Sequence, residues 1–338
     1  MKKDDLRIVF MGTPEFAVET LKRLVENQYR VVAVVTQPDK PVGRHGSVLQ
    51  PSPVKQYAVE NGLPVLQPEK MKDPAFVEQL RAYDANLQVV VAFRMLPEVV
   101  WAMPRYGTFN VHAALLPQYR GAAPINWAVI NGETQTGVTT FFLDHDIDTG
   151  RIVEQRKFDI PDTADAEYVY EGLMHLGADI CLSTIDKIVA ADGHPDTVSQ
   201  DDFVSASADT SAGQLVLKPA PKLFKENCQI DWSMTAKQVY DFVRGLSPYP
   251  GAWTSLAEAH STGAEGKATT LKVYSTTKTG TPTDGRKPGT IVADRKRLCI
   301  ACADQMLQID SLQMAGKKRM DAQAFLNGMK DIENYSAQ

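Results

Sequence analysis

The sequence predicts an α/β protein with a doubly wound, Rossmann-like domain at its N-terminus and an OB-like β-barrel at its C-terminus. The apolar runs at residues 6–10 and 31–35 flank a segment with helical periodicity, and this order is typical of a β-α-β unit. Residues 87–93 are apolar except for Gln88, as expected for a central parallel strand that helices cover on both faces. The barrel is predicted from four short β-type runs, at residues 271–274, 289–292, 298–301 and 306–309.

Three amphipathic segments are predicted to be helices. In the first, Thr13 is expected to cap the helix and Pro14 to occupy its first position. The apolar face of this helix consists of Ala17, Val18, Leu21, Leu24 and Val25. The second helix covers about residues 168–189 and the third covers residues 235–246.

A change of composition after the second helix suggests the domain organisation. From residue 190 to about residue 213 the chain loses its periodicity and is rich in Asp, Ser, Thr and Ala, which favours a connector. We therefore expect a catalytic domain at residues 1–190, a linker at 191–213 and the OB-like domain at 214–335.

The bulk properties are those of an ordinary globular protein of 338 residues. No apolar leader or membrane-length run is present, so we expect a cytoplasmic location. The net charge of −5 gives no support for a nucleic-acid partner, so only local basic patches could bind one. Cys299 and Cys302 form a single Cys-x-x-Cys within an apolar run, which is weak evidence for zinc; buried thiols and no metal are expected.

The candidate active site lies at the end of a predicted strand. Asn110 and His112 alternate with Phe109 and Val111, so both polar side chains project from one face of the strand. An amide donor and an imidazole, with a carboxylate such as Asp148 to orient the imidazole, can stabilise an oxyanion and transfer one proton. No Ser or Cys nucleophile stands beside them. This pattern favours direct attack by a substrate amine or water on an acyl carbon.

Several motifs in one order resemble the formyltransferases that use 10-formyltetrahydrofolate. They include Asn110-Val111-His112, then Leu115-Leu116-Pro117-Gln118-Tyr119-Arg120-Gly121, and Asp148-Thr149-Gly150. Further similar segments, such as Gly12-Thr13-Pro14-Glu15-Phe16-Ala17 and Ser247-Pro248-Tyr249-Pro250-Gly251, extend the resemblance over nearly the whole chain. Within the family the chain is most similar to the members that act on methionyl-tRNA.

The resemblance implies roles for individual residues. Asn110 and His112 take the oxyanion and proton-transfer roles, with Asp148 as their acid-base partner. The folate-binding residues are Ala114, Leu115, Leu116, Pro117 and Gln118, together with Phe93. Departures from the family pattern are Ala113-Ala114, where Gly-Ser is usual, and Ala92-Phe93-Arg94, where Ala-Tyr-Gly is usual.

The resemblance also implies the partners. The co-substrate is 10-formyltetrahydrofolate, without a metal, and the acceptor is initiator methionyl-tRNA. The residues implied to contact tRNA are Arg44 and Lys40 of an inserted loop and Lys222, Lys317 and Lys318 of the C-terminal domain. A monomer is expected.

Three alternative functions are compatible with the fold. A 10-formyltetrahydrofolate hydrolase-like enzyme or a sugar-amine formyltransferase would carry the same three polar residues; the loop near Arg44 and the segment of Lys222 and Trp232 favour tRNA. In a different class, the α/β domain would only support a nucleic-acid-binding barrel. The polar strand end and Asp148 argue against that scaffold, which has no need of them.

Overall fold

The computed structural model describes residues 1–42, 48–202, 216–258, 268–329 and 331–338. Within it the chain forms two compact units, and neither is a single continuous stretch. The first unit contains Met1–Gly121, Gln135–Asp159 and Tyr170–Ala220. The second contains Ala122–Thr134, Ile160–Val169 and Pro221–Gln338.

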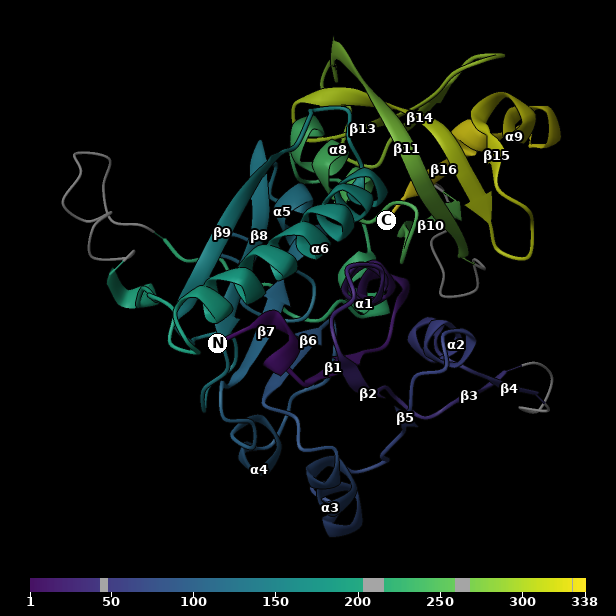
Figure 1. Cartoon of the computed structure of the whole chain (residues 1–338). Helices are drawn as coiled ribbons and strands as arrows, with labels where there is room; N and C mark the ends of the chain where they lie inside the picture. The colour runs from purple at the N-terminus through teal and green to yellow at the C-terminus, as the bar shows by residue number, and fades with distance from the viewer. Residues whose placement is uncertain (43–47, 203–215, 259–267, 330) are drawn as a thin grey trace. The chain divides into compact units, whose positions relative to one another are not determined.

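The first unit is built on a mixed sheet in the strand order β5-β2-β1-β6-β7-β8-β9 (Figure 1). Its elements are η1 (Lys3–Asp5), β1 (Ile8–Gly12), α1 (Glu15–Glu26), β2 (Val31–Val35), β3 (Lys40–Val42), β4 (Val48–Gln50), α2 (Pro53–Glu60), β5 (Val65–Leu66), α3 (Pro74–Ala82), β6 (Leu87–Val91), α4 (Glu98–Trp101), β7 (Thr108–His112), β8 (Gln135–Phe142), β9 (Ile152–Asp159) and α6 (Ala166–Ala190), whose first turn belongs to the second unit. Strands β5, β2, β1, β6 and β7 pair in parallel, and β8 and β9 extend the sheet beyond β7 as antiparallel strands. The chain reverses its direction of winding between β1 and β6, as the doubly wound prediction requires.

Helices cover both faces of this sheet. On one face, Met11 of β1 and Val90 of β6 share a buried cluster with Phe76 and Leu80 of α3. On the other face lie α1 and α6 (Figure 1), which meet where the ring centroids of Phe16 and Tyr170 are 5.2 Å apart. The near-continuous apolar strands are therefore buried on both sides.

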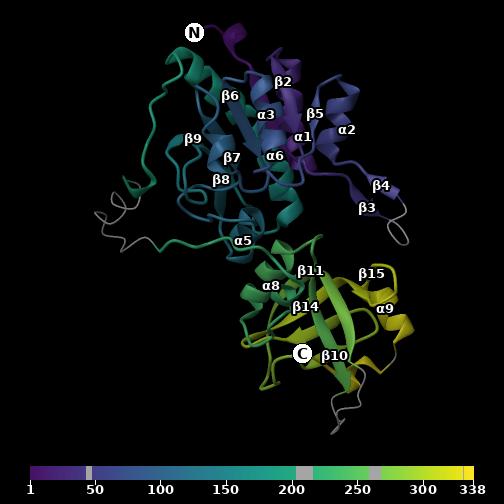
Figure 2. The same cartoon turned by 90° about the horizontal axis from the view of Figure 1, so that it is seen from below.

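The second unit is a nearly closed antiparallel barrel (Figure 2). Its elements are α5 (Pro124–Ile130), η3 (Lys225–Cys228), α8 (Ala236–Gly245), β10 (Ala252–Glu258), β11 (Thr269–Pro282), β12 (Ile291–Ala293), β13 (Leu298–Ala301), β14 (Gln305–Met314), β15 (Met320–Asp321), α9 (Ala322–Gly328), η4 (Ile332–Asn334) and β16 (Tyr335–Ala337). The strand order is β12-β13-β14-β11-β10-β16, and a bridge between Thr290 and Ser336 brings the two ends of the sheet together. Val239 and Val243 of α8 are buried in its core.

Most of the local predictions are confirmed. The second and third predicted helices correspond to α6 and α8, and Thr235 caps α8 by accepting from the Gln238 amide. The predicted cap of the first helix is wrong: α1 begins at Glu15 after Pro14, and the Thr13 hydroxyl instead lies 3.4 Å from the Gln37 amide. None of the helices in the described parts of the chain is long and apolar enough to span a membrane.

Candidate active site

Strand β7 carries the two predicted catalytic side chains on one face. Val90 on β6 pairs with Asn110 and belongs to the buried cluster beneath α3. Paired residues project from one face of a sheet, so Asn110 and His112 face the side that α3 covers. His112 is the last residue of β7 and lies at its carboxyl end. Ligands of doubly wound sheets bind beyond these strand ends. His112, with Asn110 two residues before it, therefore lies at the edge of the sheet where folds of this class bind ligands.

The His112 imidazole is fixed by a backbone carbonyl. Its Nε2 lies 2.9 Å from the carbonyl oxygen of Tyr119, and the ring packs edge-on against Phe141. A carbonyl can only accept, so Nε2 carries a proton. The other ring nitrogen, Nδ1, faces the Asp148 carboxylate at 3.9 Å, which is an electrostatic contact longer than a hydrogen bond. The two ring nitrogens therefore face a backbone carbonyl and a carboxylate. Asp148 is predicted from the sequence to orient the imidazole, whereas the hydrogen bond that orients the ring is made with the carbonyl of Tyr119.

Asp148 is held in an unusual backbone conformation. Its φ angle is 56°, in the left-handed region that Asp tolerates better than most residues. The Gly121 amide donates to the same carboxylate oxygen, Oδ2, at 2.9 Å. Gly121, in the loop after β7, and Gly150, in the turn after Asp148, leave no room for a side chain. A Cβ at Gly121 would lie 2.4 Å from the carbonyl oxygen of Ala220, and a Cβ at Gly150 would lie 1.7 Å from the carbonyl oxygen of Phe142. The carboxylate is thus fixed by loop geometry as well as by its hydrogen bond.

Asn110 carries an unsatisfied buried atom. Within the described residues its Oδ1 has no hydrogen-bond partner, although it is removed from solvent. Leaving such a group unpaired costs about 1–3 kcal/mol. Groups of this kind are frequently completed by a substrate at a functional site. An N–H group of a bound reactant fits this acceptor, and the amide nitrogen on the same side chain can donate to an oxyanion.

The predicted folate loop follows β7 directly and is tightly bonded. The Thr139 hydroxyl donates to the Ala114 carbonyl at 2.6 Å and accepts from the Leu116 amide at 3.1 Å. Gln155 donates to the Leu116 carbonyl at 2.7 Å. Ala114, Leu116 and Pro117 are buried, and Leu115 and Gln118 are partly exposed. Folate contact by these residues stays a prediction, and the buried ones would act by holding the backbone of the loop.

Phe93 lies just after β6, at the winding reversal. Ala92 before it has a φ angle of 47°, which ends the strand at Val91, two residues earlier than the apolar run suggests. Arg94 donates to the carbonyls of Pro68 and Glu69, and burial lowers the pKa of its guanidinium. Phe93 itself is partly exposed. The guanidinium carbon of Arg94 lies 5.7 Å from the centroid of the Phe93 ring.

Four of the five residues predicted to contact tRNA lie at exposed positions. Lys40 is exposed at the start of β3, and Arg44 lies outside the described residues. Lys222 is exposed with its ammonium 5.5 Å from the Phe224 ring. Lys317 and Lys318 are exposed in the turn between β14 and β15. All five stay predictions.

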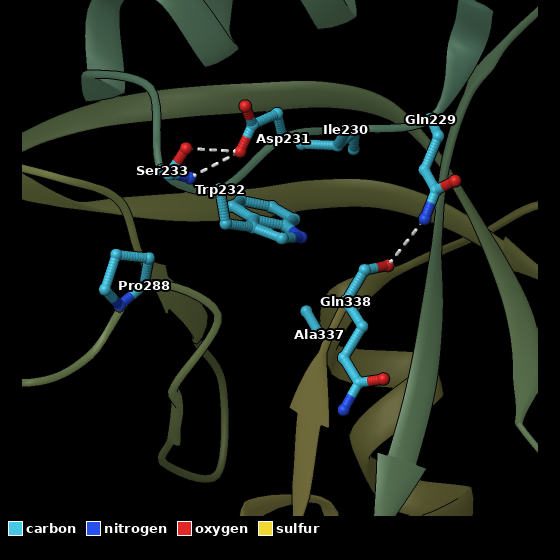
Figure 3. A pocket seen from close by; sticks show the side chains of 8 residues that line it. All are labelled: Gln229, Ile230, Asp231, Trp232, Ser233, Pro288, Ala337 and Gln338. Atoms are coloured by element: carbon cyan, nitrogen blue, oxygen red, sulfur yellow. Dashed lines mark hydrogen bonds between the residues drawn. The ribbon is translucent and has the colours of Figure 1, made fainter. Parts of the chain in front are cut away.

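A hollow of about 470 Å³ in the second unit contains none of the predicted site residues. Figure 3 shows Ser233 bonded to Asp231, and Gln229 bonded to the backbone of Gln338 across the opening. Trp232, in the segment that favoured tRNA, lines it but is only 4% exposed, and its Nε1 donates to the Thr254 hydroxyl. Trp232 is thus a residue of the barrel core.

Two groups that hold the site are not predicted from the sequence. The Tyr119 carbonyl is a backbone atom, so no side-chain pattern could identify it. Gln200 lies in the stretch predicted to be a linker, yet it is 2% exposed and donates to the carbonyls of Asp148 and Gly150. The bond between Gly121 and Asp148 and the bond between His112 and Tyr119 each join two motifs that the sequence itself singled out.

Comparison with known proteins gives two family matches that together span most of the chain. Residues 6–185 match the family described as formyl transferase, and residues 222–330 match its C-terminal domain. A protein of Parabacteroides distasonis named methionyl-tRNA formyltransferase is 58% identical over 99% of both chains. One of the same name from Bacteroides thetaiotaomicron is 52% identical over 99% of both.

Solved structures share the fold at low identity. HypX from Aquifex aeolicus in complex with tetrahydrofolic acid has a TM-score of 0.56 at 18% identity, covering 96% of this chain and 48% of that one. An N-formyltransferase from Helicobacter canadensis, in complex with folinic acid and dTDP-3-aminofucose, has a TM-score of 0.59 at 16% identity. It covers 93% of this chain and 100% of that one.

Proposed function

The chain belongs to the formyl transferase family, and we propose that it transfers the formyl group of 10-formyltetrahydrofolate to the α-amine of initiator methionyl-tRNA. The product is N-formylmethionyl-tRNA, which serves translation initiation. The full-length identity to proteins named methionyl-tRNA formyltransferase supports the acceptor. The observation that carries the chemistry is the meeting of Asn110, His112 and Asp148 at the end of β7.

Asn110 and His112 stabilise the charge that develops during transfer. When the amine adds to the formyl carbon, the carbonyl oxygen becomes an oxyanion. The Asn110 amide and the imidazolium of His112 supply a donor and a positive charge on the same face of the strand. Donors fixed before the reaction need no reorganisation, which makes this kind of stabilisation effective.

Asp148 transfers the proton from the attacking amine to the folate. The attacking amine loses a proton as the new C–N bond forms, and N10 of the folate needs one as its bond to the formyl carbon breaks. The Asp148 carboxylate faces His112 and is only 14% exposed, so it can accept the first proton and return it to N10. The overall reaction then requires no metal and no covalent acyl-enzyme.

The co-substrate is a folate. Structural relatives were solved with tetrahydrofolic acid and with folinic acid, which agrees with a folate site on this fold. The residues proposed to line it are Phe93 and the loop of Ala114, Leu115, Leu116, Pro117 and Gln118. The unpaired acceptor of Asn110 at the adjacent strand end fits an N–H of one of the two reactants.

The acceptor is bound by basic residues at several places in the chain. The proposed contacts are Lys40 and Arg44 in the inserted loop and Lys222, Lys317 and Lys318 in the C-terminal domain. Since the whole chain carries a net charge of −5, such local patches must supply the attraction to phosphate. We expect a cytoplasmic monomer. A sugar amine is not favoured as the acceptor, because the relatives that match over the full length are named for methionyl-tRNA.

The experiment is a transfer assay with carbon-13 label in the formyl group. The purified protein is mixed with labelled 10-formyltetrahydrofolate and methionine-charged initiator tRNA, and the aminoacyl group is then released and weighed by mass spectrometry. We expect labelled N-formylmethionine from the parent protein and at least a hundredfold slower formation by the His112→Ala variant. Absence of the labelled product from the parent protein would refute the proposal.

A further inference from the structure

Gln200 connects the two loops that form the active site. Its side-chain amide nitrogen donates to the carbonyl oxygens of Asp148 and Gly150, both at 2.9 Å. Its Oε1 accepts from Nε and Nη2 of Arg120, at 3.0 and 2.6 Å. Gln200 is only 2% exposed, so this side chain, which is hydrogen-bonded at both ends, is shielded from water.

The orientation of this amide is determined by its partners. Arginine can only donate and carbonyls can only accept, so the oxygen of Gln200 must face Arg120 and its nitrogen must face the Asp148 turn. The backbone beside Gln200 is fixed as well, because Val198 forms a bridge with Ile152 at the start of β9. Arg151 also donates to the hydroxyl and the carbonyl of Thr197. A short, well-anchored segment therefore carries the amide.

Three successive residues of the loop after β7 contact three parts of the site. The Tyr119 carbonyl accepts from His112, the Arg120 guanidinium binds Gln200, and the Gly121 amide donates to the Asp148 carboxylate. The Gln200 bonds join the Arg120 end of this loop to the backbone on both sides of Thr149. Asp148 holds a left-handed conformation there, and the bond from Gln200 to its carbonyl helps to fix it.

We propose that Gln200 is a positioning residue that fixes the Asp148 carboxylate opposite His112 for the transfer reaction. The inference rests on the proposed function and adds to it a residue outside the motifs of the catalytic strand and loops. Gln200 touches neither reactant in this role. It acts through the backbone of Asp148, so its loss changes the rate of the chemical step more than the binding of either substrate.

The test compares steady-state kinetics of the parent with Gln200→Met and Gln200→Glu. Methionine keeps the length and removes both kinds of bond, whereas glutamate keeps the acceptor for Arg120 and removes the two donors. We expect both variants to lose at least tenfold in kcat, with KM for each substrate within threefold of the parent. If Gln200→Met fails to fold, Gln200→Glu decides the question alone.

The second measurement is a double-mutant cycle, which tests whether the effects of Gln200 and Asp148 on kcat are coupled. If Gln200 acts through this carboxylate, adding Gln200→Glu to Asp148→Asn should change kcat less than twofold beyond Asp148→Asn itself. Asn86→Leu is the matched control, because Asn86 accepts from the Arg7 amide and donates to the Asp5 carbonyl, both at 2.8 Å. It lies at the amino end of β6, whereas His112 lies at the carboxyl end of the parallel strand β7. It should lower thermal stability and leave kcat unchanged.

The outcomes separate the two proposals. A parent enzyme that does not form N-formylmethionyl-tRNA refutes the function. An active parent together with a Gln200→Glu variant of parental kcat refutes only the positioning role. Full additivity of Gln200→Glu with Asp148→Asn would likewise overturn it, because the glutamine would then act independently of the carboxylate.

Discussion

Substitution of Asn110 by Ala should separate stability from activity. The Oδ1 of Asn110 is buried and has no partner among the residues that the structure describes, which costs the folded protein about 1–3 kcal/mol. Truncation to Ala removes that penalty together with some packing of a partly exposed side chain. We therefore expect the free energy of unfolding to stay within about 1 kcal/mol of the parent value, or to rise.

The same change should greatly slow transfer. Removal of one donor to a developing oxyanion typically costs about 2.7–4 kcal/mol, which corresponds to a 100- to 1,000-fold loss in kcat. KM for the folate should change little, because the charge is present mainly in the transition state.

Urea denaturation and steady-state formyl transfer, measured on one preparation, check both halves of this prediction. A variant that loses several kcal/mol of stability and keeps its kcat would refute the reasoning, since Asn110 would then be a structural side chain.

Three further predictions concern other groups. Asp148→Asn should fold, because an amide oxygen can still accept from the Gly121 amide, and should lose at least about 100-fold in kcat; thermal melting and kinetics measure the two effects. Burial raises the pKa of the Glu154 carboxyl, but bonds from Ser183 and Lys187 outweigh it and hold that pKa below its ordinary value of 4.5. Its stabilising effect is therefore present above pH 4.5 and lost as the pH falls through the lowered pKa, so urea titrations should show Glu154→Gln less stable than the parent by about 1–3 kcal/mol at pH 7 and a shrinking difference below pH 4.5. A constant difference would contradict the ionic role. Arg44→Ala should raise KM for methionyl-tRNA, leave KM for the folate unchanged and reduce the salt dependence of tRNA affinity; an unchanged KM for tRNA would favour a different acceptor.

Strand β7 could be predicted because the pattern that specifies it is local. Alternation of Asn110 and His112 with Phe109 and Val111 fixes which side chains share a face, and the strand forms as expected. The barrel strands were predicted only where apolar residues alternate. Strand β11 extends to Pro282 through polar residues because its backbone pairs with β14, which a hydropathy pattern does not record.

The supporting contacts could not be predicted because they depend on tertiary structure. The Tyr119 carbonyl that orients His112 carries no side-chain signal at all. Gln200 was hidden in a stretch whose composition is typical of a connector, and the contacts that bury it come from residues about 50 and 80 positions away. Thr13 matched the sequence pattern of a helix cap but is used by the neighbouring strand end instead.

Acceptor competition tests the central claim most directly. Labelled 10-formyltetrahydrofolate is offered to the enzyme with methionine-charged initiator tRNA and a nucleotide-linked amino sugar together, and free formate reports transfer to water. We predict that N-formylmethionyl-tRNA is the dominant product and that its share falls when Arg44 is replaced by Ala. Dominant formylation of the sugar, or release of formate at the same rate with and without the tRNA, would contradict the account.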